Sequence, residues 1–272
     1  MIERRPSVSL ELLLYLILFS FGAWLRFNQL DRQPLTDPEA REALAALPQP
    51  AEFQPPDPGP SSPAYQVLTG LAFSFTGAED HTARWAPAVA GSLLLLTPLL
   101  LRRQIGRGPA LLTTLLLGIS PTLWAASRTA GGSAIAALGI LAAVLFLARA
   151  RAETRGNLEG AAAMLGLAAA TGQAGLLGLA SLGVGSAALV AIRRRRGNPD
   201  PDRTLALPWP AALDAEALRR CLLLAGVVAL AIASGLGFFV RALGGVFGGL
   251  GSWAGGWFVA SGIPAASVML NL

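Results

Sequence analysis

The sequence VSLELLLYLILFSFGAWL, residues 8–25, is an almost unbroken apolar run near the N-terminus. As an α-helix it would be about 27 Å long, at about 1.5 Å per residue, which is enough to cross the hydrocarbon core of a bilayer. Arg4 and Arg5 precede it, as they would in a signal peptide, but the run continues into WLR instead of a small-residue cleavage site. We therefore expect a retained first membrane helix, with Glu11 near its cytoplasmic end.

The composition of the whole chain extends this prediction. Of its 272 residues, 53% are hydrophobic and only 14% are charged, and the mean hydropathy is +0.55. A soluble domain of this length needs more charged surface. The sequence therefore predicts an all-α, polytopic helical membrane protein whose surroundings are the lipid bilayer.

Further apolar runs predict about seven to eight transmembrane helices in total. Two of them, Gly160–Gly172 and Gly175–Ile192, adjoin each other and fit either two short helices or one long tilted helix. Gly and Ala are dense in this region, which allows helices to approach closely in lipid. The expected membrane helices are Val8–Leu25, Trp85–Leu101, Pro109–Ala125, Ser133–Ala148, the two runs between 160 and 192, Cys221–Val240 and part of Trp253–Leu272.

The arginines determine the predicted topology. All 21 basic residues are Arg, and most lie in short segments between the apolar runs, as the positive-inside rule expects of cytoplasmic segments. The formal net charge of +5 therefore indicates membrane anchoring and not nucleic-acid binding. The N-terminus is then cytoplasmic, and residues 26–84 form a long outer loop. The segments assigned to the cytoplasm are Arg4–Arg5, Arg102–Arg107, Arg149–Arg155 and Arg193–Arg196.

These assignments divide the chain into three parts. Residues 1–192 form the first transmembrane region, residues 193–220 form a basic, proline-rich cytoplasmic linker, and residues 221–272 supply the C-terminal transmembrane helices. Within the outer loop, the apolar Ala64–Phe75 segment is too short to cross and fits a surface or re-entrant helix. The end of the linker, Leu213–Arg220, also fits a surface helix.

Missing residue types exclude several kinds of chemistry. The chain has no Lys, so it forms neither a Schiff base nor a lysine-dependent phosphate loop. His81 and Cys221 are the only residues of their kinds, which excludes a zinc site, a bis-histidine haem and an intrachain disulfide. We expect no cofactor or metal in this chain, and a redox cofactor would have to be held by a partner. His81 fits a solvated residue better than a base, and Cys221 fits a small apolar core residue.

Three acidic residues crowd the outer loop in PLTDPEAREALAAL, residues 34–47: Asp37, Glu39 and Glu42. Asp37 at the N-cap, Pro38 at the first helical position and Glu39 in the first turn would make a favourable helix start. A carboxylate in this loop would also be placed to accept a proton from a hydroxyl group. Helix capping alone, and capping combined with a catalytic or binding role, both remain open.

Three ordered segments resemble the GT-C membrane glycosyltransferases, which include the protein O-mannosyltransferases and the aminoarabinose transferases. They are WLRFNQLDRQPLTDPEA, PAYQVLTGLAFSFTGAEDHTARWAPAVAG and RRQIGRGPALLTTLLLGISPTLWAASRTAGGSAIAAL, all within residues 10–150. The resemblance implies a GT-C-like N-terminal half, a polyprenyl-phosphate sugar as donor, and the cytoplasmic membrane of a bacterium or archaeon. It implies that Asp37 and Glu39 are the candidate catalytic carboxylates and that Arg128 contacts the lipid phosphate.

Two functions are compatible with this resemblance. One is an active transferase that moves a sugar from a polyprenyl-phosphate donor to an extracytoplasmic acceptor. The other is a descendant of the same scaffold that serves as a non-catalytic accessory or structural subunit of a larger membrane complex, for example an electron-transfer complex, with other integral membrane subunits as partners. Pro38 separates Asp37 from Glu39 where the family has adjacent Asp and Glu, and family members are usually longer. Both features favour the accessory function.

Overall fold

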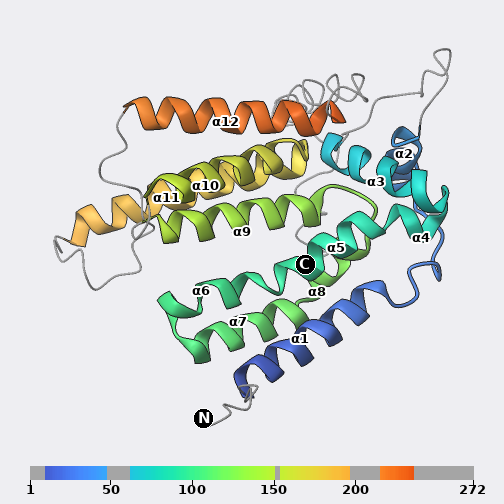
Figure 1. Ribbon diagram of the computed structural model, residues 1–272, viewed down its shortest axis with the longest axis horizontal. Helices are drawn as coiled ribbons and strands as arrows, with labels where there is room; N and C mark the ends of the chain where they lie inside the picture. Colours follow the sequence, from blue (N-terminus) through green and yellow to red (C-terminus); the bar gives the residue numbers. More distant parts are fainter. Residues whose placement is uncertain (1–9, 48–61, 151–153, 197–214, 236–272) are drawn as a thin grey trace, which may run out of the picture.

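The computed structural model describes residues 10–47, 62–150, 154–196 and 215–235 (Figure 1). All regular structure in these ranges is helical, which confirms the predicted all-α class. The helices are α1 (Leu10–Phe27), α2 (Asp37–Ala45), α3 (Pro63–Thr76), α4 (Asp80–Ala83), α5 (Trp85–Leu94), α6 (Thr97–Ile105), α7 (Arg107–Ile119), α8 (Pro121–Arg128), α9 (Ser133–Arg149), α10 (Thr154–Ala169), α11 (Gln173–Arg196) and α12 (Ala215–Ala233).

Two stretches of the described chain are long and apolar enough to cross a bilayer. They are α1 and the Asp80–Arg102 stretch, which α4, α5 and most of α6 form in succession. The helices α7 and α8 would together form a third span, although the chain bends by 57° between them. The described residues thus form a helical protein with two or three candidate membrane spans, which is compatible with the predicted membrane protein.

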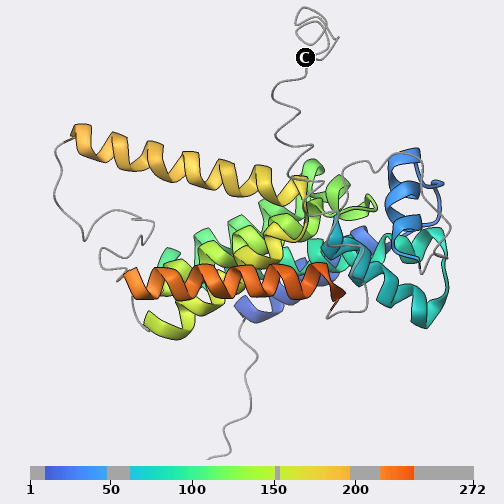
Figure 2. The same ribbon diagram turned by 90° about the horizontal axis from the view of Figure 1, so that it is seen from above.

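The helices form a bundle with a cap at one end. Most of the longer helices run side by side in Figure 1, and α10 packs against both α9 and α12. The helices α2, α3 and α4, all from the predicted outer loop, lie together at one end of the bundle in Figures 1 and 2. Because α1 leads into this cap and α5 leads out of it, the loop that carries the candidate site lies over the ends of both helices.

Several predicted helices agree with the structure. The helix α9 matches Ser133–Ala148, and α3 matches the predicted surface helix Ala64–Phe75, each to within one residue at either end. The region from 160 to 192 contains two helices, α10 and α11, and not one long helix. The chain turns between them, where Gly172 has a φ of +69°, a left-handed conformation that glycine adopts without strain.

The predicted continuous helix Pro109–Ala125 is wrong, because α7 ends at Ile119 and α8 begins at Pro121. Proline lacks a backbone N–H and disfavours a helical conformation in the residue before it. Ser120 is accordingly extended, and its hydroxyl oxygen accepts a hydrogen bond from the Leu123 N–H at 3.4 Å. The proline therefore starts a new helix with its own cap.

The prediction of a separate surface helix at Leu213–Arg220 is also wrong. The helix α12 begins at Ala215 and continues through Cys221 to Ala233, so the polar turn and the apolar run belong to one helix. Its first residues, AEALRR, are good helix formers, and Glu216 and Arg220 form an ion pair one turn apart. The proline-rich part of the linker, residues 197–214, and the predicted Trp253–Leu272 segment lie outside the described residues.

Glycines allow the closest contacts between the packed helices. A Cβ added at Gly139 would lie 3.0 Å from the Met164 backbone oxygen, which joins α9 to α10. A Cβ added at Gly166 would lie 2.5 Å from the Ala225 backbone oxygen, which joins α10 to α12. In lipid, close packing of small residues is a main source of helix association. These glycines therefore hold the three helices together.

Replacing Gly166 with Ala should separate α10 from α12. The added methyl group meets backbone atoms that no rotamer change moves, so we expect the free energy of unfolding to fall by about 1–3 kcal/mol. Gly226→Ala on α12 is the matched control, because nothing lies within 4 Å of its Cβ position. Cys221 lies on α12 beside Leu158 of α10, and its maleimide labelling rate measures the separation. Equal labelling of the two variants would contradict the prediction.

Candidate functional site

The candidate site begins where α2 starts, and the structure corrects the predicted cap. The N-cap is Thr36, so Asp37 and Pro38 are the first two helical residues and Glu39 is the third. The Glu39 carboxylate accepts hydrogen bonds from the Thr36 backbone N–H at 2.9 Å and from the Thr36 hydroxyl at 3.0 Å. A threonine followed three residues later by glutamate is the capping-box spacing, which places the cap one residue before Asp37.

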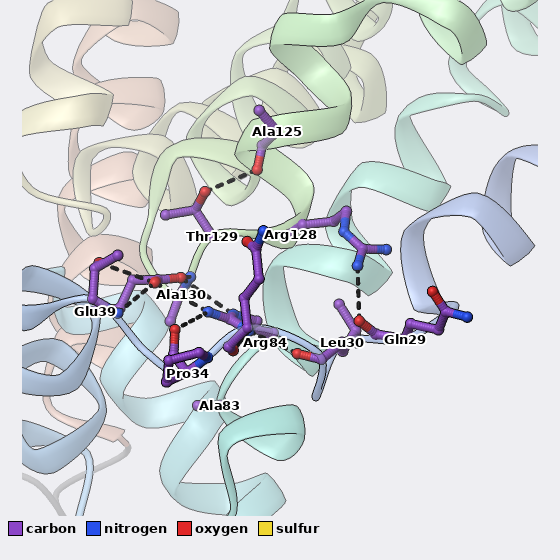
Figure 3. A network of polar contacts seen from close by, with 12 residues as sticks. Gln29, Leu30, Pro34, Glu39, Ala83, Arg84, Ala125, Arg128, Thr129 and Ala130 are labelled. Atoms are coloured by element: carbon purple, nitrogen blue, oxygen red, sulfur yellow. Dashed lines mark hydrogen bonds and ion pairs between the residues drawn. The ribbon is translucent and has the colours of Figure 1, made fainter.

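Glu39 is buried and both of its oxygens are fully engaged (Figure 3). Arg84 donates from Nε to Oε1 at 3.2 Å and from Nη2 to Oε2 at 3.1 Å, and the Ala130 N–H donates to Oε1 at 2.8 Å. Burial alone would raise the pKa of Glu39, but the bonds from Arg84, Thr36 and Ala130 outweigh it and hold the pKa below its usual range. Glu39 is therefore a poor proton acceptor and a good structural anion.

Arg84 fastens the loop between α1 and α2 to the cap. Its Nη1 donates to the backbone oxygens of Leu30 and Gln33, both at 2.7 Å, and its Nη2 donates to that of Pro34 at 3.3 Å. Together with the two bonds to Glu39, these bonds use all of the N–H donors of the planar guanidinium group. Sequence reasoning missed Arg84, because nothing local distinguishes it from the other arginines of the chain.

Arg128, the predicted phosphate contact, fastens the end of α1. Its Nη1 donates to the backbone oxygens of Leu25 at 2.9 Å and Asn28 at 2.7 Å, and its Nη2 donates to that of Gln29 at 3.0 Å. The guanidinium also lies 5.1 Å from the centre of the Trp124 ring, within cation–π range. A cation at a helix C-terminus is stabilised by the carbonyls that end the helix. Arg128 therefore already has an internal role that accounts for its position.

Arg26 is a third arginine of this region and is fully buried. Its Nη1 donates to the Gly22 backbone oxygen at 2.9 Å and its Nη2 donates to the Leu117 backbone oxygen at 3.3 Å. The side chain fits because Gly91 faces it, and a Cβ there would lie 3.1 Å from the arginine Nε. Arg26, Arg84 and Arg128 thus all bind backbone oxygens, two of them in the loop between α1 and α2.

The predicted site residues do not form one cluster. Glu39 and Arg128 belong to the same polar network, because the Ala130 N–H that binds Glu39 lies two residues after Arg128. Asp37 is exposed at the start of α2, where its negative charge favours the helix N-terminus. The arrangement can hold the outer loop rigidly, and it leaves Asp37 as the accessible carboxylate of the two predicted ones.

Glu42, one turn after Glu39, is a second carboxyl group whose environment shifts its pKa. Its two oxygens accept from the Ser62 backbone N–H at 3.1 and 3.3 Å, which ties α2 to the start of α3. Burial raises the pKa of Glu42 to about 7, against the opposing hydrogen bonds from Ser62 and Gln66. The sequence identified this acid but predicted no role for it, because its burial depends on a helix that lies 20 residues further along the chain.

No metal site is found among the described residues, where no three His, Cys, Asp or Glu side chains lie close enough to share an ion. His81 pairs with the Glu79 carboxylate at 3.1 Å and is partly exposed, with the Trp85 ring edge-on at 5.8 Å. Among the described residues, neither the His81 nor the Glu79 side chain bonds to the side chain of Glu39 or Arg84. His81 is thus placed as a surface residue of the cap.

Comparison with known proteins assigns no family. No protein-family model matches the chain, and neither a curated protein nor a solved structure matches it at a significant level. The resemblance to the GT-C glycosyltransferases therefore stays a prediction from sequence segments.

Proposed function

We propose that this chain is a non-catalytic accessory or structural subunit of a larger membrane complex, such as an electron-transfer complex, built on a GT-C-like N-terminal half. One observation carries the proposal: two of the three charged groups expected to serve a transferase site, Glu39 and Arg128, are engaged by internal hydrogen bonds. Glu39 accepts five of them, and Arg128 donates to the backbone at the end of α1. Such a network favours rigidity of the outer loop over proton transfer or phosphate binding.

We further propose the full topology of about seven to eight spans with a cytoplasmic N-terminus, in the cytoplasmic membrane of a bacterium or archaeon. Its support is the clustering of arginine segments at one end of the bundle. Glu11 at the start of α1 pairs with Arg102 and Arg107 at the junction of α6 and α7. Arg149 at the end of α9 donates to the Leu100 backbone oxygen at 2.6 Å. The cap of α2–α4 lies at the other end, as an outer loop would.

Co-purification tests the accessory function. After extraction of the source membrane in a mild detergent, we expect this chain to migrate in a native gel with other integral membrane proteins at fixed stoichiometry. Mass spectrometry of the band identifies these subunits and any redox cofactor that they carry. Migration as an isolated monomer in several mild detergents would overturn the proposal.

A transferase is the second candidate function, because the Asp37 side chain is exposed at the start of α2, in the cap. This function requires that purified protein release polyprenyl phosphate from a labelled polyprenyl-phosphate sugar. Asp37→Asn should abolish that release, whereas Asp80→Asn, an equally exposed acid in the first turn of α4, should not. Our proposal expects no release from the unmodified protein, so release that depends on Asp37 would replace the accessory function with the enzymatic one.

A further inference from the structure

A second polar cluster lies at the end of the bundle opposite the cap. Glu11, in the first turn of α1, has a side chain only 14% exposed. Its Oε1 lies 3.6 Å from Nη1 of Arg102, and its Oε2 lies 3.4 Å from Nε of Arg107. Tyr15, one turn later on α1, is 3% exposed, and the charges of Glu11 and Arg102 both act on its phenol. Glu11 and Tyr15 therefore share the face of α1 that meets α6 and α7.

This cluster is incompletely bonded in the described structure. Glu11 Oε1 is buried and accepts no hydrogen bond, and the Tyr15 hydroxyl is buried without a partner. A buried polar atom without a hydrogen bond costs about 1–3 kcal/mol, so two such atoms on residues one helical turn apart favour a ligand that completes the site. The charges also do not balance, because two guanidinium groups face a single carboxylate. The missing ligand therefore brings an anionic group together with at least one hydrogen-bond donor.

We propose that this cluster binds the phosphoethanolamine headgroup of a membrane lipid. The phosphate would accept hydrogen bonds from Arg102, Arg107 and the Tyr15 hydroxyl, and the ammonium group would donate to Glu11. Each partner of the present ion pairs then receives a new partner of opposite charge, and both unpaired atoms are satisfied. The headgroup is neutral overall, but it places its phosphate beside the two arginines and its ammonium beside the carboxylate, so each charged group faces an opposite charge.

The position and mobility of the side chains suit a lipid. The cluster lies where α1 begins and the Asp80–Arg102 stretch ends, which is the boundary of both candidate spans. The Arg102 and Arg107 side chains are 45% and 83% exposed, so they are free to turn from Glu11 toward a headgroup phosphate. On the same stretch of α1, Leu12, Leu13 and Leu16 are exposed apolar residues, as expected of a segment that contacts acyl chains.

Lipid selectivity in native mass spectrometry tests this inference. The purified full chain, in an uncharged detergent, is titrated with phosphatidylethanolamine, phosphatidylcholine or phosphatidylglycerol of identical acyl chains. Phosphatidylcholine has the same phosphate but no N–H donor for Glu11, and phosphatidylglycerol has no cation. We expect phosphatidylethanolamine to bind about tenfold more tightly than either, the effect of one charge-assisted hydrogen bond. Competition by water-soluble glycerophosphoethanolamine shows whether the headgroup binds without its chains.

Two variants separate this site from general lipid adhesion. Glu11→Gln should abolish the preference over phosphatidylcholine and turn the preference toward phosphatidylglycerol, because the site becomes more positive. Tyr15→Phe should weaken binding of all three lipids without loss of stability, since the hydroxyl it removes has no partner. The matched control is Glu216→Gln, an exposed first-turn acid of α12 that also pairs with an arginine. Equal affinity for the ethanolamine and choline lipids, or selectivity unchanged in Glu11→Gln, would overturn the proposal.

Discussion

Replacing Arg84 with Gln should lower the free energy of unfolding by about 3–5 kcal/mol, the cost of breaking a buried ion pair from one side. The Glu39 and Arg84 side chains are only 6% and 7% exposed, so the carboxylate left behind stays charged and desolvated. The same substitution also frees the backbone oxygens of Leu30, Gln33 and Pro34 from their donor. Unfolding by SDS titration in detergent micelles, followed by the fluorescence of the six tryptophans, measures the loss.

The exposed ion pair on α12 supplies the control for this prediction. Arg220→Gln breaks a pair with Glu216 on the surface of one helix and should change stability by less than about 0.5 kcal/mol. A double substitution of Glu39 and Arg84 by Gln and Leu should recover part of the loss, because no unpaired charge remains. If Arg84→Gln were as mild as Arg220→Gln, the buried pair would not stabilise the cap, and the main support for a structural role of Glu39 would fail.

The helices were predictable because their signals are local. Apolar runs bounded by short polar segments predicted α1, α3 and α9 closely, since hydrophobicity and segment length alone determine such elements. The break at Pro121 was also readable, because proline acts on its own turn. The apolar pattern of Pro109–Ala125 alone predicts a continuous helix, and the Ser-Pro step within it overrides that pattern.

The candidate site was much less predictable, because its contacts are distant in sequence. Glu39 binds Arg84, 45 residues later, and the Ala130 N–H, 91 residues later. Pattern reasoning recognised that Glu39 and Arg128 were unusual but could not tell an internal partner from a substrate. An arginine that binds a phosphate and an arginine that binds three backbone carbonyls look the same in the sequence, and only the fold distinguishes them.

The shift of the cap from Asp37 to Thr36 has a physical consequence for function. As the first helical residue, Asp37 is not needed to accept the N–H groups of the turn, because Glu39 and Thr36 close the capping box. The accessible acid is thus the one least required for the fold. Of the two predicted catalytic carboxylates, only Asp37 is accessible to a substrate, which is why its substitution decides between the two proposed functions.

Replacing Glu42 with Gln should stabilise the protein at pH 8.5 by about 3 kcal/mol and have little effect at pH 4. Burial raises the pKa of Glu42 to about 7 in the folded state, from a usual value of 4.5. The folded protein therefore holds this proton more tightly than the unfolded chain does. Its contribution to stability is fully present below about pH 4.5 and is lost as the pH rises through 7. A difference of about 2.5 between the two pKa values corresponds to about 3 kcal/mol.

The neighbouring carboxylate provides a control of opposite sign on the same helix. The pKa of Glu39 is held below its usual range, so Glu39 stabilises the protein above the unfolded pKa, and this contribution is lost as the pH falls. At pH 8.5, Glu39→Gln should therefore destabilise the cap while Glu42→Gln stabilises it. Burial raises the pKa of Tyr65 as well, so this nearby phenol stays neutral over the range and does not mask the effect.

Stability measured every half unit from about pH 2.5 to pH 8.5 separates the contributions of the two acids. The unmodified protein should lose stability between about pH 4.5 and pH 7 and then level off. Glu42→Gln should flatten that slope and leave in place the loss of stability at acid pH that Glu39 causes. Because both residues lie on α2 within one turn, a general effect of losing a negative charge would move both variants in the same direction. A parallel shift of the two profiles would show that Glu42 is solvated and charged in the folded cap, and that α2 is not pressed against the start of α3 as the hydrogen bonds to Ser62 require.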